Sequence, residues 1–278
     1  MSKRNVLLLG GDQRQLYCAK ELLKKGYEVS LFGFEKVLDI DKHFPVFQNL
    51  KVAVVLADVI ILPVNYKSDK FINAPFGEQM IKVDDVLHYL DEPKLFICGK
   101  LSAALKAAFE QRQQSVLELL EDESFLLDNA QMTAEGAVFE VMKELPERLF
   151  KKKCLILGYG RIGKCLTSLL KGFEVDITVA ARRKESLTEA RLSGVRTIAL
   201  KEASVTDYNI VFNTIPARVT EGSIENNGAL FVNLANREDY GFSNVLLAGG
   251  VPGKYCPKTA GKIISDFILS YLSEVEYE

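Results

Sequence analysis

The sequence predicts an α/β protein with two tandem doubly wound, Rossmann-like domains and a cleft between them. Two segments, "KRNVLLLGGDQRQLYCAKELLKKGYEVSLFG" and "KKCLILGYGRIGKCLTSLLKGFEVDITVAA", share one plan: a short apolar strand, a glycine turn, an amphipathic helix and a second strand. Short apolar runs continue the alternation after both segments. A chain of 278 residues with 48% hydrophobic composition can bury the cores that two such domains require.

The first domain is expected over residues 1–130. Its first strand, residues 6–9, is a short apolar run followed by a glycine turn, as is typical of a parallel strand buried on both faces. The helix after this turn is predicted to end at Gly26, which can adopt a left-handed C-cap conformation. Three further strands are predicted in the segments "ADVIILPV", "KLFICG" and "SFLLD".

The second domain is expected over residues 131–257 and begins with a bridging helix. In "MTAEGAVFEVMKELPERLF", Thr133 can cap this helix and Pro146 limits its other end. A strand, a helix ending at Gly172 and later strands in "YNIVFNTIPA", "GALFVNLAN" and "NVLLAGG" complete the domain. A last helix, in the segment 258–278, is expected to pack back on the first domain.

The composition argues for a small-molecule partner. A formal net charge of -2, with both signs interspersed, argues against nucleic acid or a membrane surface. The longest apolar run, residues 52–64, is interrupted by Asp58 and is shorter than the ~20 residues of a membrane span. Five scattered cysteines without a C-x-x-C pattern predict reduced thiols in a cytoplasmic protein, and two histidines argue against a zinc cluster. The N-terminal apolar stretch breaks at Asp12, so no signal peptide is expected.

The segment "LILGYGRIG" predicts a dinucleotide site. Gly158, Gly160 and Gly163 have G-x-G-x-x-G spacing between a strand and a helix that begins near Arg161 and Ile162. The first glycine permits a tight turn, the second lets a pyrophosphate approach the backbone, and the third lets the helix pack on the strand. The alternative is a glycine turn that serves packing alone.

The segment "ITVAARRKE" predicts a preference for NADP, with NAD possible. The strand ends at Ala181, where an acidic residue would hold the ribose hydroxyls of NAD and would repel a 2′-phosphate. Arg182 and Arg183 follow, and their guanidinium groups can bind phosphate in a bidentate manner. The alternative is a solvated basic start of a helix.

The turn of the first domain, "LLLGGDQRQ", lacks the third glycine and has Asp12 where a phosphate would approach. A second nucleotide is therefore not expected. Arg14 lies at the carboxyl end of the predicted sheet and is a candidate clamp for a substrate carboxylate. Alternatively, Arg14 forms a salt bridge with Asp12 or caps a helix.

Seven segments spread over nearly the whole chain point to one family: "GGDQRQ", "IILPV", "TAEG", "LGYGRIGKCL", "ARR", "NTIPA" and "AGGVPGKYCPKTAG". Together they resemble the family of the dipicolinate synthase dehydrogenase component, the A subunit of that enzyme, and the last segment is the most specific. The resemblance implies the two-domain architecture of 2-hydroxyacid and alanine dehydrogenases, with a C-terminal NAD(P) domain. One segment departs from the family: a glycine-rich S-R-P-G-G segment is replaced by "NREDY" at residues 236–240, in what we expect to be a shorter loop.

The resemblance also implies an activity and partners. It implies oxidation of a dihydrodipicolinate, formed from 4-hydroxy-tetrahydrodipicolinate, to pyridine-2,6-dicarboxylate with NADP as the acceptor. It further implies that the partner is the flavoprotein-like B subunit of dipicolinate synthase, and a place in the cytoplasm of the mother cell of a spore-forming bacterium. We also expect a homo-oligomer.

A dicarboxylate substrate requires two cationic or hydrogen-bonding sites, and ring oxidation requires a base. In "CPKTAG", Lys258 and Thr259 start the last helix and can form a carboxylate site, unless Lys258 is simply solvated. We expect Arg14 and Lys258 to approach the substrate from opposite sides of the cleft. Glu135 is a candidate base, although an ordinary acidic residue in a first helical turn is the favoured interpretation.

The segment "NTIPA" follows a core strand and is expected to line the nicotinamide ribose through its backbone, unless it is merely a proline-terminated strand end. The residues concerned are Asn213, Thr214, Ile215, Pro216 and Ala217. The leading hypothesis is therefore an NADP-dependent dehydrogenase of a cyclic dicarboxylate. The alternatives are a related reductase of another small carboxylic acid and a catalytically silent NADP-binding subunit.

Overall fold

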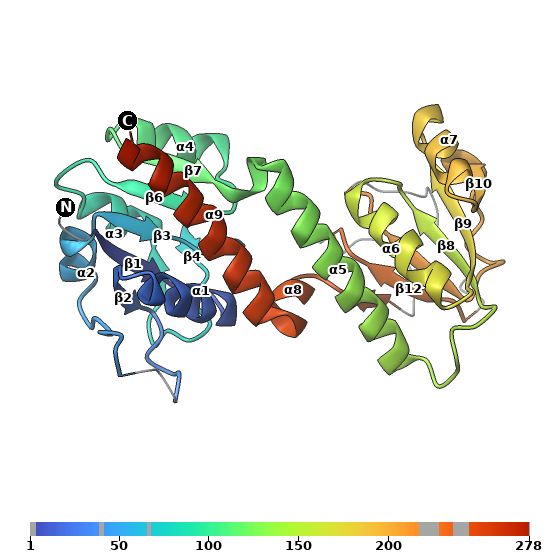
Figure 1. Ribbon diagram of the computed structural model, residues 1–278, viewed down its shortest axis with the longest axis horizontal. Coiled ribbons are helices and arrows are strands. Elements are labelled where there is room, and N and C mark those ends of the chain that lie inside the picture. Colours follow the sequence, from blue (N-terminus) through green and yellow to red (C-terminus); the bar gives the residue numbers. More distant parts are fainter. Residues whose placement is uncertain (1–3, 39–41, 66–67, 217–227, 236–244, 278) are drawn as a thin grey trace. The chain divides into compact units, whose positions relative to one another are not determined.

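The computed structural model describes residues 4–38, 42–65, 68–216, 228–235 and 245–277 (Figure 1). The chain forms two compact units: the first contains Met1–Leu126 and Pro257–Glu278, and the second contains Leu127–Cys256. Helix α5 (Glu123–Glu144) therefore passes from the first unit into the second.

The first unit is built on a parallel sheet with the strand order β2-β1-β3-β6-β7. Its strands are β1 (Asn5–Leu9), β2 (Glu28–Phe32), β3 (Val59–Ile61), β6 (Leu95–Cys98) and β7 (Ser115–Glu118). A small antiparallel pair, β4 (Phe71–Ile72) and β5 (Ile81–Lys82), forms a separate sheet. The helices of this unit are α1 (Gln13–Lys24), α2 (Leu50–Leu56), α3 (Val83–His88), α4 (Ala103–Glu110), the 3₁₀ turn η1 (Leu119–Glu121) and α9 (Pro257–Tyr277).

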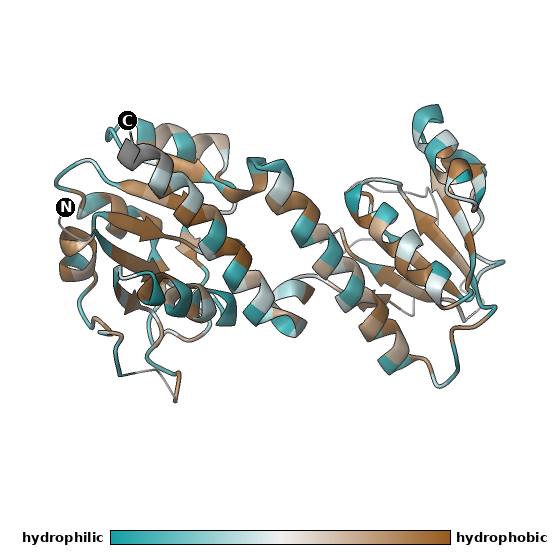
Figure 2. Ribbon diagram, in the orientation of Figure 1, coloured by the Kyte–Doolittle hydropathy of each residue, from teal (hydrophilic) through white to brown (hydrophobic). Residues whose placement is uncertain are grey.

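Strand β1 is buried on both faces. Val6 and Leu8 belong to one hydrophobic cluster, whereas Leu7 and Leu9 belong to another. The hydrophobic colour of the strands in Figure 2 agrees with this arrangement. A central parallel strand that helices cover on both sides is uniformly apolar for this reason.

The second unit is built on a six-stranded parallel sheet with the order β10-β9-β8-β11-β12-β13. Its strands are β8 (Lys153–Leu157), β9 (Asp176–Ala181), β10 (Arg196–Ala199), β11 (Ile210–Asn213), β12 (Leu230–Asn233) and β13 (Val245–Leu247). Its helices, besides α5, are α6 (Arg161–Gly172), α7 (Lys184–Leu192), the 3₁₀ turn η2 (Leu200–Glu202) and α8 (Val251–Tyr255). The chain starts at the centre with β8, moves outward to β10 and returns to β11, so the doubly wound fold class is confirmed.

Two expectations about α5 are wrong. The segment "SFLLD" is its first part rather than a strand, because Asp122 accepts a hydrogen bond from the backbone N–H of Phe125 at 2.7 Å and starts the helix there. Thr133 consequently lies in the middle of the helix, where its hydroxyl donates to the carbonyl of Asn129 at 2.6 Å. The periodicity of a short apolar run does not distinguish a strand from a buried helix. The N-terminal cap at Asp122 is what makes this segment helical.

The two predicted glycine C-caps differ in outcome. Gly26 follows the end of α1 with φ +89°, as expected for a left-handed position. Gly172 is instead the last residue of α6, and the left-handed position after that helix belongs to Glu174, with φ 52°.

Helix α8 is anchored on α5 within the second unit. A Cβ atom on Gly136 would lie 2.7 Å from Cβ of Val251, so the two segments approach closely. The carboxylate of Glu140 is buried and accepts hydrogen bonds from Nζ of Lys254, at 2.5 Å, and from the hydroxyl of Tyr255. Burial alone would raise the pKa of Glu140, but these two hydrogen bonds outweigh it and the pKa is lowered.

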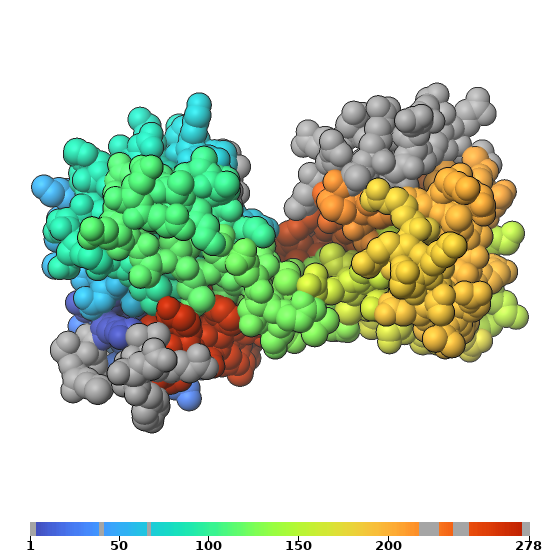
Figure 3. Space-filling model, turned by 90° about the horizontal axis from the view of Figure 1, so that it is seen from above, coloured from blue at the N-terminus to red at the C-terminus, as the bar shows by residue number. Residues whose placement is uncertain are grey.

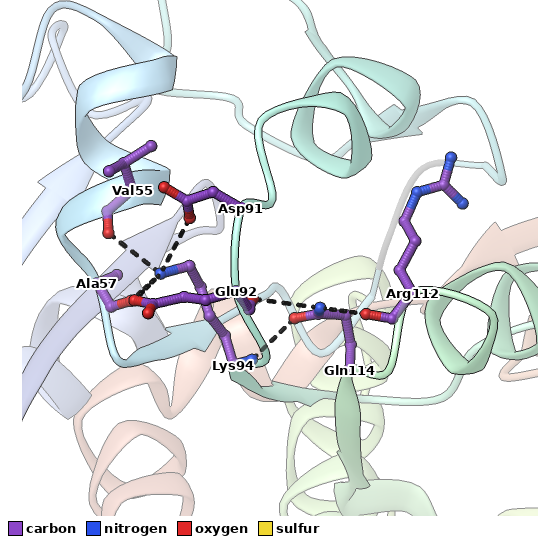
Figure 4. A network of polar contacts seen from close by, with 7 residues as sticks. All are labelled: Val55, Ala57, Asp91, Glu92, Lys94, Arg112 and Gln114. Carbon is purple, nitrogen blue, oxygen red and sulfur yellow. Dashed lines mark hydrogen bonds and ion pairs between the residues drawn. The ribbon is translucent and has the colours of Figure 1, made fainter.

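A buried lysine ties the amino ends of the first sheet together (Figure 4). Nζ of Lys94 donates to the carbonyls of Val55, at 3.1 Å, and Ala57, at 2.9 Å, and its backbone N–H donates to Gln114 Oε1 at 2.9 Å. Lys94 and Gln114 immediately precede β6 and β7. The network therefore lies at the edge opposite to the carboxyl ends of the strands, where ligands bind in such folds.

Helix α9 packs along α1 in the first unit (Figure 1), and its red surface is continuous with that unit in Figure 3. A Cβ atom on Gly261 would lie 2.5 Å from the carbonyl oxygen of Arg14 and 2.5 Å from Cβ of Tyr17. The backbones of the two helices are therefore in direct contact at this glycine.

We predict that Gly261→Ala lowers the free energy of unfolding of the first unit by about 1–3 kcal/mol, because the added methyl group overpacks the crossing of the two helices. Gly172→Ala is the matched control, since a Cβ atom there meets no described atom within 4 Å. Urea denaturation of both variants measures the effect. Equal stability of the two variants would contradict the packing argument.

Candidate functional site

The carboxyl edge of the second sheet brings the predicted cofactor residues together. Strands β8, β9 and β11 end at Leu157, Ala181 and Asn213, and β8 lies between the other two. The strand order reverses between β8 and β11. Ligands of doubly wound folds bind in the crevice at such a switch point.

The three glycines of the turn have different physical roles. Gly158 has φ +98°, and a Cβ atom there would lie 2.5 Å from Oγ1 of Thr214. A Cβ atom on Gly163 would lie 2.4 Å from the carbonyl oxygen of Gly158. Packing therefore requires glycine at both positions. The alternative interpretation, in which the glycines serve packing alone, accounts for Gly158 and Gly163.

Gly160 is different, because a Cβ atom on it would meet no described atom within 4 Å. It is the N-cap of α6, and it has no side chain to bind the first backbone N–H groups of the helix. Arg161 and Ile162 form the first turn, and Ile162 packs on the hydrophobic core. The open space above Gly160 and the start of a long helix fit a pyrophosphate group.

Tyr159 is a residue of the turn that sequence reasoning missed. Its ring is buried, and its hydroxyl donates to Oγ of Ser193, at 3.1 Å, after the end of α7. Lys164 lies over the ring, 5.9 Å from its centroid, and pairs with Glu189 of α7 at 2.9 Å. The turn is thus joined to α7. The spacing of the glycines contains no signal for this contact, since the partners are far apart in the sequence.

The end of β9 has the chemistry expected from the basic run. Ala181 is buried, whereas Arg182 and Arg183 are exposed and α7 begins immediately after them. Neither guanidinium group pairs with a carboxylate of a described residue. Both groups are therefore available to a 2′-phosphate or to solvent.

The segment after β11 is held against the glycine turn. The backbone N–H and the hydroxyl of Thr214 donate to the carbonyl of Leu157 at 3.0 and 2.9 Å. Asn213 is fully buried, Ile215 is buried and Pro216 is exposed. Ala217 and the predicted short loop at 236–240 lie outside the described residues.

Glu135 is exposed on α5, well after the start of that helix, so the interpretation as a first-turn residue is wrong. Its carboxylate accepts a hydrogen bond from Gln131 at 3.0 Å. Burial chiefly, and the charge of Glu135 in addition, raises the pKa of Cys165 in α6 and of Cys256 after α8.

In the first unit, Arg14 forms the predicted alternative salt bridge. Its side chain is buried, and Nε and Nη2 donate to the two carboxylate oxygens of Asp12 at 2.9 and 2.8 Å. Asp12 also caps α1. Lys258 and Thr259 are exposed in the first turn of α9. They belong to the same unit as Arg14, because α9 packs on the first unit, so the expectation that Arg14 and Lys258 lie on opposite sides of the cleft is wrong.

Comparisons with known proteins agree with the two units. Residues 5–120 match the family of the N-terminal domain of the dipicolinate synthase A subunit, and residues 125–235 match "D-isomer specific 2-hydroxyacid dehydrogenase, NAD binding domain". The chain is 27% identical to the dipicolinate synthase A subunit of Bacillus subtilis (strain 168) over 290 residues, which cover 98% of this chain and 97% of that protein.

Two solved structures have the same fold. The dipicolinate synthase A subunit of Bacillus halodurans matches with a TM-score of 0.83 and 22% identity, covering 97% of each chain. Its counterpart from Bacillus subtilis matches with a TM-score of 0.83 and 23% identity, covering 100% of this chain and 98% of that one. The predicted resemblance is therefore confirmed, as is the prediction of an NAD(P)-dependent oxidoreductase. None of the described helices is long and apolar enough to cross a membrane.

We predict that Gly160→Val abolishes binding of the nicotinamide cofactor while the protein remains folded, because its side chain enters the open space above the turn. Fluorescence enhancement of the reduced cofactor measures binding, and circular dichroism measures folding. Gly163→Val is the contrasting variant, because it clashes with Gly158 and should destabilise the unit itself. Retained cofactor binding by a folded Gly160→Val protein would place the site elsewhere.

Proposed function

Starting from its similarity to the dipicolinate synthase A subunit over nearly the whole chain, we propose that this protein is the dehydrogenase that forms dipicolinate, pyridine-2,6-dicarboxylate. That full-length similarity is the observation that carries the proposal. The substrate is a dihydrodipicolinate, which forms from 4-hydroxy-tetrahydrodipicolinate by loss of water. Its oxidation releases a hydride and a proton, and the ring becomes aromatic.

The second unit binds the cofactor in this proposal. The cofactor, when bound, accepts the hydride from the ring. The backbone of the glycine turn and the N-terminus of α6 hold its pyrophosphate, while Arg182 and Arg183 hold the 2′-phosphate of NADP. The backbone of residues 214–216 lines the nicotinamide ribose. The open space above Gly160 and the absence of an acidic side chain at Ala181 support this assignment.

The substrate residues are assigned by their charge. Lys258 and Thr259 form a carboxylate site in the first turn of α9, where the helix N-terminus adds favourable charge. Arg14 is the candidate for the second carboxylate, although its salt bridge with Asp12 means that it would have to share its guanidinium group. Glu135 is the candidate base that takes the proton.

The similarity to the A subunit of a synthase supports the B subunit of that enzyme as partner and a role in spore formation, in the cytoplasm of the mother cell. Two other functions predict different results in one assay. A related reductase would act on another small carboxylic acid. A silent NADP-binding subunit would bind the cofactor without turnover.

The cofactor assignment predicts tighter binding of NADP(H) than of NAD(H). Arg182→Ala and Arg183→Ala should each weaken NADPH binding by about 10-fold or more, the equivalent of one charge-assisted hydrogen bond of roughly 1.5–3 kcal/mol, and should leave NADH binding nearly unchanged. Arg191→Ala, which removes a guanidinium group from the other end of α7, is the matched control. Equal affinities of the wild-type protein for both cofactors, measured by calorimetry, would refute the preference.

The reaction itself is tested by NADPH formation with enzymatically generated 4-hydroxy-tetrahydrodipicolinate. We expect turnover, and we expect Lys258→Ala to lower kcat/KM by about 30-fold or more, since loss of a charged partner typically costs ~2–5 kcal/mol. NADPH affinity should not change. Lys262→Ala is the control, because Lys262 is exposed one turn later and pairs with Asp266. Tight NADPH binding without any turnover would instead support the silent alternative.

A further inference from the structure

Two buried asparagines end neighbouring strands at the carboxyl edge of the second sheet. Asn213 is the last residue of β11 and Asn233 is the last residue of β12, and the two are direct partners in the strand register. Their exposed fractions are 0% and 1%. We call these two residues the asparagine pair.

Both members make the same local turn. Oδ1 of Asn213 accepts the backbone N–H of Ile215 at 3.1 Å, and Oδ1 of Asn233 accepts that of Ala235 at 3.1 Å. Such a bond to the residue two positions later replaces a backbone turn. Each side chain thus determines how the chain leaves its strand.

A direct contact between the side chains connects the two turns. Nδ2 of Asn213 donates to Oδ1 of Asn233 at 3.3 Å and to the carbonyl of Ile215 at 3.3 Å. The backbone N–H of Leu234 donates to the carbonyl of Asn213 at 3.0 Å. Because buried amides are costly without partners, replacing one member changes both turns.

The glycine turn is held by Thr214 rather than by the asparagine pair. Thr214, which follows Asn213, donates to the carbonyl of Leu157 through both its backbone and its hydroxyl, and it lies against Gly158. Strands β8, β9 and β10 make up one mononucleotide half of the doubly wound sheet, and β11, β12 and β13 make up the other. In the proposed function, the glycine turn, Arg182 and Arg183 bind the adenosine half of the cofactor. The half of the sheet that contains β11 and β12 therefore faces the nicotinamide.

We propose that the asparagine pair positions the nicotinamide half of the cofactor through the backbone of residues 214–216 and 234–235, without touching the cofactor itself. This inference rests on the proposed binding of a dinucleotide at this edge. It assigns a positioning role to Asn213, whose side chain is buried and hydrogen-bonded within the protein. It assigns the same role to Asn233. The adenosine half should be insensitive to the pair.

The test is Asn213→Asp, which keeps the shape of the side chain and replaces its Nδ2 donor with oxygen. When charged, the introduced carboxylate would face two acceptors, Oδ1 of Asn233 and the carbonyl of Ile215. A protonated carboxyl group can still donate to them. Burial raises the pKa of such a group, so the donor is present at low pH and is lost as the pH rises through the raised pKa.

We expect the variant to bind NADPH about 10-fold or more weakly than the wild type at high pH, with affinity recovering as the pH falls. Binding of adenosine 2′,5′-bisphosphate, which lacks the whole nicotinamide nucleotide including its ribose, should match the wild type throughout. Asn209→Asp is the matched control at the opposite end of β11, where Oδ1 accepts the backbone N–H of Lys153 and no asparagine pair exists. It should show neither effect.

Two outcomes overturn the proposal: unchanged NADPH binding by Asn213→Asp, or an equal loss of affinity for NADPH and for adenosine 2′,5′-bisphosphate. If Asn213→Asp does not fold by circular dichroism, Asn213→Ser replaces it. That shorter side chain can keep the local turn without reaching Asn233, and it should lose NADPH affinity selectively without the pH dependence. A wild-type protein that binds neither ligand would refute the proposed function rather than the role of the pair.

Discussion

The close approach of α6 to the glycine turn is the constraint on which the second unit depends. A Cβ atom on Gly163 would lie 2.4 Å from the carbonyl oxygen of Gly158, so no larger residue fits without displacing the helix. This contact brings the N-terminus of a long helix to the point where the strand order reverses. The dipole of the helix and its first N–H groups are then directed at the edge of the sheet where an anionic ligand can bind.

The two units show how one plan supports different chemistry. In the second unit, the helix after the turn begins with Gly160, which has no side chain, and the space above it is open. In the first unit, the equivalent place holds Asp12, which caps α1 and binds Arg14 with both oxygens. The glycine turn of the first unit therefore already contains a carboxylate, which would repel a phosphate group at this place.

Contacts between distant parts of the sequence assemble each unit. Residues from α9, at the end of the chain, complete the first unit through the crossing at Gly261. In the second unit, Glu140 of α5 binds Lys254 and Tyr255 of α8, and these hydrogen bonds lower the pKa of Glu140 despite its burial, because they favour the charged form. The hydrogen bonds between Asn213 and Asn233 and between Tyr159 and Ser193 likewise join segments that are far apart in the sequence.

The sequence by itself determined the fold class, the glycine turn and the basic run after Ala181, because each depends on the spacing of residues along a short segment. It did not determine that "SFLLD" is helical, since a short apolar run fits either element and the cap at Asp122 decides. Nor could it pair Asn213 with Asn233, or Tyr159 with Ser193. Those facts depend on strand register and helix packing between residues far apart in the chain, and only the tertiary structure brings such residues together.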